Sequence, residues 1–152
     1  MNSSLETFLD VANMPTPQSF IITDGVGAKN GTEVDLQDTD GCAWVVVVTN
    51  VNTTGTLQLL LQHNAVSATA EATATDRDGN NMDTGAAAIT AVGTYIVTAK
   101  SESLLRFSRL VATVATVGID FIMYPIPHGH QYKSKPTESI AVGDNLVIQL
   151  AT

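Results

Sequence analysis

The chain has 152 residues, of which only 14% are charged, against roughly 25% in an ordinary soluble domain. This length suits a single domain with one hydrophobic core. The net charge of −8 argues against a nucleic-acid-binding protein, which needs Lys and Arg to neutralise phosphates, and against binding to an anionic membrane. The low charge fraction indicates either that other subunits cover part of the surface, or that the surface is solvated and consists largely of neutral Thr, Asn and Ser side chains.

The single cysteine, Cys42, permits neither an intrachain disulfide nor a cysteine-based metal site. It opens an apolar run, which favours a buried, unreactive thiol over a catalytic one. We find no basic region followed by an apolar stretch at the N-terminus, and no apolar run near the roughly 18 residues of a membrane span. We therefore expect synthesis in the cytoplasm and no membrane segment.

The first segment, Ser3 to Asn13, has the pattern of a short amphipathic helix. Ser3 and Glu6 have capping-box spacing, and Pro15 and Pro17 follow the segment. Its apolar residues fall on one helical face: Leu5, Phe8, Leu9 and Ala12. A helix this short is marginal in water, so we expect it to dock on its own β domain or on a neighbouring subunit. We treat residues 1–18 as an N-terminal arm and residues 19–152 as one domain.

From residue 19 onward the pattern is that of strands. Val and Thr make up about a quarter of the chain, and β-branched residues favour a half-buried sheet. Clusters of Gly, Asp and Asn separate short candidate strands, which predicts an all-β, jelly-roll-like β-sandwich. The candidates are Ser19–Thr23, Thr32–Leu36, Cys42–Thr49, Thr56–His63, Gly93–Ala99, Leu105–Thr116, Ile119–Pro125 and Asn145–Ala151.

The candidate strands differ in their apolar faces. Residues 43–48 are apolar on both faces, as in a central strand that is covered on both sides. In a two-layer protein such a strand needs a second cover, either the N-terminal helix or a neighbouring copy. Residues 57–61 and 146–150 alternate between a core face and a mixed face. Residues 65–91 have few large apolar side chains, which predicts one weak strand near residues 70–75 within a long excursion.

No motif of a phosphate-binding loop, a serine hydrolase or a zinc protease is present, so we expect no enzymatic activity and no cofactor. His128 and His130 could share one metal, because residues i and i+2 of a strand point the same way, but a third ligand is required. The alternative is a solvated pair in a stiff edge between prolines. His63, which ends a strand, is expected to hydrogen-bond locally.

Two acidic clusters need consideration as cation sites. Asp76, Asp78, Asn80 and Asp83 resemble a calcium loop, but Asn81 and Ala87 stand where an EF-hand requires Gly and Glu. A looser oxygen-ligand site, including Asp76 and Asp78, stays open. Turn chemistry accounts for the second cluster, which comprises Asp35, Asp38 and Asp40.

Two arginines and the single tryptophan complete the candidates. Arg106 and Arg109 are three apart on a candidate strand and so face opposite sides, which leaves one of them half-buried. A half-buried arginine needs a carboxylate or backbone carbonyls, and we expect it to be an internal anchor. Trp44 lies in the most apolar strand, which predicts a core position and argues against a lectin.

A series of elements runs through Val34–Gly129, roughly two-thirds of the chain. It consists of an Asp-containing segment before a first apolar strand, a second apolar strand, an Ala/Thr/Asp-rich middle, an Arg-aromatic-x-Arg element that leads into a β-branched stretch, a Gly turn and a last strand. The residues concerned are Val34-Asp35-Leu36, Cys42–Val48, Leu57–Leu61, Arg106-Phe107-Ser108-Arg109, Leu110–Val117, Gly118 and Ile119–Pro127. This series resembles the small jelly-roll proteins encoded near the capsid genes of tailed bacteriophages.

This resemblance implies a capsid decoration, or cement, protein: a virion structural protein that binds the outer surface of the assembled capsid and stabilises it. Its implied partners are the major capsid protein and further copies of itself, often as a homotrimer. We assign Leu5, Phe8 and Leu9 to the partner interface. The alternatives are a phage tail or baseplate module, a carbohydrate-binding β-sandwich, and a metal-dependent enzyme that uses His128 and His130.

Overall fold

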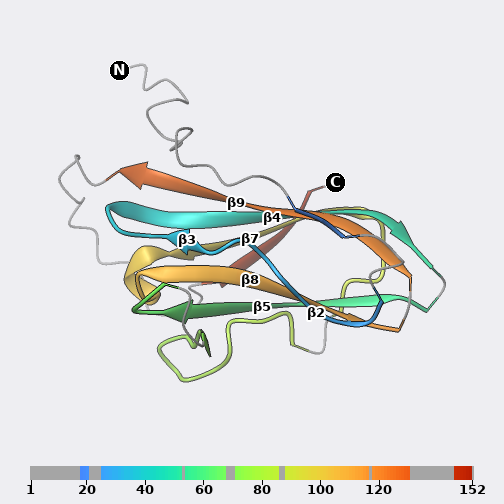
Figure 1. Cartoon of the computed structure of the whole chain (residues 1–152), viewed down its shortest axis with the longest axis horizontal. Helices are drawn as coiled ribbons and strands as arrows, with labels where there is room; N and C mark the ends of the chain where they lie inside the picture. The colour runs from blue at the N-terminus through green and yellow to red at the C-terminus, as the bar shows by residue number, and fades with distance from the viewer. Residues whose placement is uncertain are drawn as a thin grey trace, which may run out of the picture.

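A computed structural model describes residues 18–20, 25–52, 54–67, 71–85, 88–116, 118–130 and 146–151. These residues form two antiparallel sheets that face each other, which confirms the predicted all-β sandwich (Figure 1). Sheet A has the strand order β1-β9-β4-β7-β10, and sheet B has the order β2-β8-β5-β6, with β3 also paired to β8. The strands are β1 (Gln18–Phe20), β2 (Gly27–Asn30), β3 (Val34–Asp35), β4 (Thr39–Val51), β5 (Thr56–Asn64), β6 (Ala72–Thr73), β7 (Gly93–Lys100), β8 (Phe107–Ala115), β9 (Ile119–His130) and β10 (Leu146–Ala151), with a short 3-10 helix, η3 (Ser101–Ser103), after β7.

The strand pairs are nested along the chain. β1 pairs with β9, β2 with β8, β4 with β7 and β5 with β6, always antiparallel. The chain is therefore a long antiparallel ribbon that folds back on itself. The pairs β4·β9 and β5·β8 join the turns of this ribbon into two sheets, and β10 extends sheet A beside β7.

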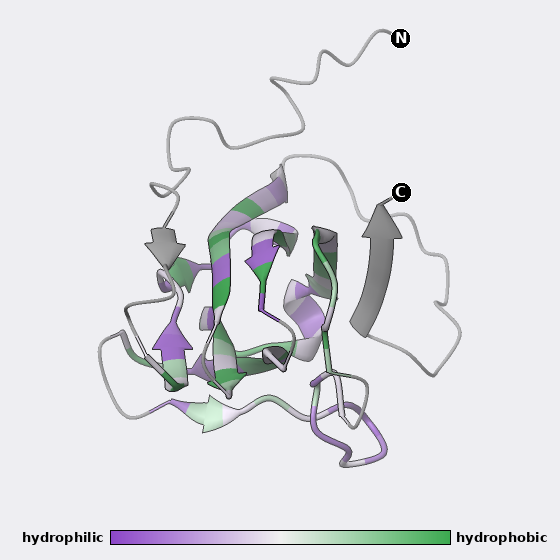
Figure 2. Ribbon diagram, turned by 90° about the vertical axis from the view of Figure 1, so that its right-hand side faces the viewer, coloured by the Kyte–Doolittle hydropathy of each residue, from purple (hydrophilic) through white to green (hydrophobic). Residues whose placement is uncertain are grey.

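The core lies between the two sheets and follows the period-two pattern of the strands. In sheet A, Trp44, Val46 and Val48 alternate with side chains that point outward, and in sheet B residues 57, 59 and 61 do the same. These inward side chains are at most 1% exposed. The alternation is visible as bands of colour along the ribbons in Figure 2. Burial of this apolar surface is the main term that stabilises the sandwich.

Strand β9 is longer than predicted, because it continues through both prolines to His130. Pro125 and Pro127 pair with residues of β4, yet neither ring nitrogen can donate a hydrogen bond. On the other side of β9, the pairing with β1 reaches only as far as Met123. Among the described residues, no strand pairs with β9 on the second side of these prolines. Their missing N–H groups therefore remove no backbone hydrogen bond from the sheet.

Strand β2 is a further difference from prediction, because none of the candidate strands includes residues 27–30. The segment holds no large apolar residue except Val26, so it carries no hydrophobic signal of a strand. Its pairing with β8 through residues 111–114 supplies the stabilisation instead. The predicted helix from Ser3 to Asn13 lies outside the described residues.

The excursion after β5 seals the edge of sheet B. Its loop, drawn in light green, lies beside the free side of β5 in Figure 1, where Leu57 and Leu61 exchange backbone hydrogen bonds with it. Ala74, Met82 and Ile89 from this segment are buried in the core. The predicted weak strand is present as β6, and these three residues enter the core although the segment has few large apolar side chains. Covering an edge strand in this way prevents its pairing with other chains.

Gly129 is a position where only glycine fits. Its φ is +73°, and an added Cβ would overlap a carboxylate oxygen and the Cβ of Asp40. We expect Gly129→Ala to lower the free energy of unfolding by about 2–4 kcal/mol, the sum of left-handed backbone strain and overpacking. Urea denaturation followed by circular dichroism measures this loss.

Gly79 provides the matched control for this substitution. It also has a left-handed φ, of +83°, but nothing lies within 4 Å of an added Cβ. Gly79→Ala should cost only the backbone term of about 1–2 kcal/mol. Equal losses in the two variants would show that the contact with Asp40 has no energetic effect.

Candidate functional site

The outward side of sheet A is an apolar surface. Its residues lie in three rows across β9, β4 and β7: Ile126–Ala43–Thr98, Tyr124–Val45–Ile96 and Ile122–Val47–Thr94. Val45 is 7% exposed and the other eight are half-buried. None of the nine side chains carries a charge at neutral pH. We call these nine residues the outer face of sheet A.

The outward side of sheet B is different in character. Gln58, Gln62, Arg109 and Thr113 lie there among few apolar residues, because their neighbours in sequence point into the core. Water solvates such a surface at little cost. The two sides of the sandwich are therefore unequal, and the prediction that the segment 43–48 is apolar on both faces is confirmed. The second cover that this pattern calls for is not identified by the described residues.

The residues assigned from sequence to a partner interface are not placed. Leu5, Phe8 and Leu9 lie outside the described residues, so their assignment stays a prediction. The described residues begin at Gln18, which pairs with Met123 of β9. The arm therefore joins the sandwich at an edge of sheet A.

Polar residues gather at one end of the outer face. Lys100 and His128 are the two neighbours of Gly41 across the sheet, and a Cβ on Gly41 would lie 3.2 Å from Cε1 of His128. Burial lowers the pKa of His128, and the nearby Asp40 opposes this shift. The imidazole is thus favoured in its neutral form. The side chain of His130 is not described, so the predicted pairing of the two histidines on one metal is not tested.

A buried ionic cluster ties β8 to the excursion. Arg109 contacts Oε2 of Glu71, whose side chain is only 2% exposed, and it donates hydrogen bonds of 3.1 and 2.9 Å to Oε1 of Gln62. Desolvation raises the pKa of Glu71, Arg109 lowers it, and the neighbouring Glu33 raises it again. Glu33 in turn accepts a hydrogen bond from Ser67. Arg109 is thus the half-buried arginine with a carboxylate partner that the sequence predicted, but it lies on the outward side of sheet B and not in the interior.

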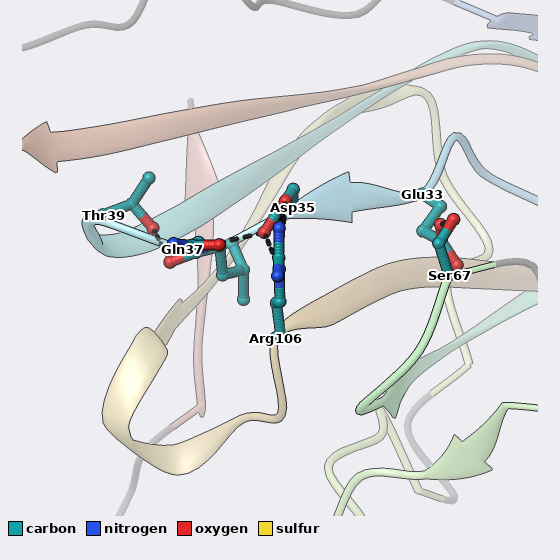
Figure 3. Close-up of polar contacts among 7 residues, drawn as sticks. Glu33, Asp35, Gln37, Thr39, Ser67 and Arg106 are labelled. Carbon is teal, nitrogen blue, oxygen red and sulfur yellow. Dashed lines mark hydrogen bonds and ion pairs between the residues drawn. The ribbon is translucent and has the colours of Figure 1, made fainter.

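Arg106 makes a second, exposed ion pair, which Figure 3 shows. Its Nε and Nη2 lie 3.0 and 2.7 Å from the two carboxylate oxygens of Asp35, and its guanidinium stacks 4.9 Å from the ring centroid of Phe107. This pairing lowers the pKa of Asp35. Both side chains are about half exposed, so water and salt screen the pair and it contributes little to stability. Arg106 precedes β8, so its predicted place within the strand is wrong.

Turns account for one carboxylate in each acidic cluster, Asp76 and Asp35, whereas Asp40 of the second cluster lies in β4. Asp76 accepts hydrogen bonds from the backbone amides of Asp78 and Asn80 and from the side-chain amide of Asn80, and these bonds lower its pKa. Asp35 accepts one from the amide of Gln37 in the same manner. Among the described residues, no three His, Cys, Asp or Glu side chains lie close enough together to hold a metal ion.

Two predicted core residues lie where the sequence put them. Trp44 is 1% exposed, and its indole N–H has no hydrogen-bond partner among the described residues. Cys42 is fully buried, and burial raises the pKa of its thiol.

His63 accepts a hydrogen bond from the amide of Leu105, so its partner is distant in sequence rather than local as predicted. Nothing in this set brings a nucleophile and a base together.

The buried partner of Arg109 was missed by sequence reasoning. Glu71 lies in the Ala- and Thr-rich excursion, 38 positions before Arg109, and nothing in its neighbours marks it as buried. Arg109 itself indicates that a carboxylate lies nearby, because a half-buried cation requires an anion as its partner.

Comparisons with protein families, with curated proteins and with solved structures found no match to this chain. Among the residues that the structure describes, no helix is long and apolar enough to cross a membrane.

Proposed function

We propose that this chain is a virion structural protein that binds the outer surface of a bacteriophage capsid and bridges neighbouring major capsid subunits. The observation that carries the proposal is the uncharged, half-buried outer face of sheet A. A monomer that exposes such a face to water forgoes the stabilisation that burial would bring. In an assembled capsid, neighbouring subunits would cover this face.

The nested strand order supports the same proposal. Apart from β10, which pairs with β7, the strands pair from the outside of the sequence inward, β1 with β9, β2 with β8, β4 with β7 and β5 with β6, and a jelly roll is expected to have this arrangement. That fold is frequent in capsid proteins. The resemblance of Val34–Gly129 to small phage jelly-roll proteins points the same way.

A decoration protein needs little chemistry. Many weak contacts, repeated around a symmetric cluster, add by avidity and hold neighbouring subunits together. A cyclic homotrimer, the oligomer we propose, needs a heterologous interface that closes into a ring. The covered edge of sheet B beside β5 fits this role, because it leaves side chains rather than an open strand edge to make contacts there.

The test mixes the purified protein with undecorated shells and measures copies bound. Deleting residues 1–14 should abolish binding, because the deletion removes the proposed contacts of Leu5, Phe8 and Leu9. Replacing all three by Ser should lower the affinity per copy more than about a thousandfold, at about 1.5–3 kcal/mol for each buried side chain.

Thr7 lies opposite the apolar stripe and provides the control. Thr7→Ser should bind shells as the unaltered chain does. Unchanged binding after the deletion would remove the assignment of Leu5, Phe8 and Leu9. No binding of the unaltered chain to any shell would remove the proposed function itself.

A further inference from the structure

We propose that, in the free protein, residues 3–13 of this chain lie as a helix over the outer face of sheet A. The occupant of the face is thus the chain's own N-terminal segment, through Leu5, Phe8 and Leu9. This packing concerns the isolated molecule before it meets any shell. It explains how a chain with an uncharged, apolar sheet face can avoid associating through that face until it is used.

The length of the face matches one helix. Along β4, the five residues from Ala43 to Val47 span about 17 Å. A helix of residues 3–13 is about 16 Å long. The three strands of the face lie about 10 Å apart from first to last, close to the diameter of about 10–12 Å of one helix with its side chains, and β10 continues sheet A beyond β7.

The apolar stripe of the segment matches the chemistry of the face. Leu5, Phe8 and Leu9 lie on one helical face, while Glu6 and Asp10 lie away from it. Packing the stripe on the uncharged rows therefore buries no carboxylate. The linker 131–145 also flanks sheet A in the sequence, but it has a central proline and no comparable stripe.

The point where the arm joins the sandwich places it beside the face. Gln18 pairs with Met123, and the next residue of β9, Tyr124, belongs to the middle row of the face. Residues 14–17 reach up to about 13 Å, enough to carry the chain from the sheet edge to the layer above. A tether this short gives a high effective concentration, which favours the chain's own face over that of another copy.

The experiment places a nitroxide spin label at position 7 in the full-length Thr7→Cys variant, without any shell. The native Cys42 is fully buried and its thiol pKa is raised, so the label attaches at position 7 alone. The methyl signals of Val45, Val47 and Ile122 should lose most of their intensity, and the signals of Gln58 and Thr113 on sheet B should not. Loss on sheet B, or none on sheet A, would overturn the proposal.

Two further measurements complete the test. The first mixes isotope-labelled chains that carry no spin label with spin-labelled chains that carry no isotope. The signals of the isotope-labelled chains should not broaden, and broadening would mean that the arm packs on another copy. Adding Phe8→Asp and Leu9→Asp to the spin-labelled chain should abolish the broadening. Broadening that persists would show that the apolar stripe does not hold the segment. These results do not depend on shell binding, so this proposal and the proposed function can fail separately.

Discussion

Replacing Trp44 by Ala is expected to lower the free energy of unfolding by about 3–5 kcal/mol, the range for removing a large buried aromatic. Trp44 is 1% exposed and its neighbours across the sheet, Val97 and Pro125, are also buried, so little can relax into the space. Because this is the single tryptophan, the variant loses its fluorescence probe. Urea denaturation followed by far-ultraviolet circular dichroism measures the loss.

Trp44→Phe is the matched control. The indole N–H has no hydrogen-bond partner among the described residues, so its removal breaks no bond and relieves an unsatisfied donor. We expect Phe to cost less than about 1.5 kcal/mol, as other volume-similar apolar replacements do. If Phe were as costly as Ala, the N–H would have a partner that the described residues do not include.

The parts of the fold that sequence predicted are those with a strong local period. In β4 and β5, apolar residues recur at every second position or continuously, and both strands lie within a few residues of the predicted bounds. Trp44 and Cys42 are buried as predicted because their neighbours are apolar. Local periodicity is enough here, since inward and outward positions follow directly from the pleat.

The parts that sequence missed depend on contacts distant along the chain. Strand β2 is defined by its pairing with β8, more than 80 positions later, and its own residues favour a turn. Met82 and Ile89 enter the core from a segment of small and polar residues, because β5 offers them an open edge. Burial of Glu71 likewise depends on Arg109, which no local pattern shows.

The candidate site was predicted in one respect and not in another. Continuous apolar character over residues 43–48 showed that β4 needs a cover on each side, but it could not show which side is the core. Only the register with β7 and β9 places Ile96, Tyr124 and Ile126 in the same surface as Val45. The charge-free outer face is thus a property of three strands together.

Replacing Arg109 by Met is expected to destabilise the protein by about 2–4 kcal/mol at pH 8, because the buried carboxylate of Glu71 then lacks its cation. The loss should shrink as the pH falls toward 5. Desolvation already raises the pKa of Glu71, and removing Arg109, which lowers it, raises it further. Urea denaturation at several pH values between 5 and 8 measures this dependence.

The sign of this dependence follows from proton linkage. Since the pKa of Glu71 is higher in the folded state, its contribution to stability is complete below the unfolded value near 4.5 and is lost as the pH rises through the folded value. In Arg109→Met the folded-state pKa of Glu71 is higher still, so the pH range over which this stability is lost extends to higher pH. Adding Glu71→Gln removes the titrating group, so the double variant should lose little stability and show no such pH dependence. A deficit of Arg109→Met that stayed constant from pH 5 to pH 8 would show that Arg109 acts through packing alone.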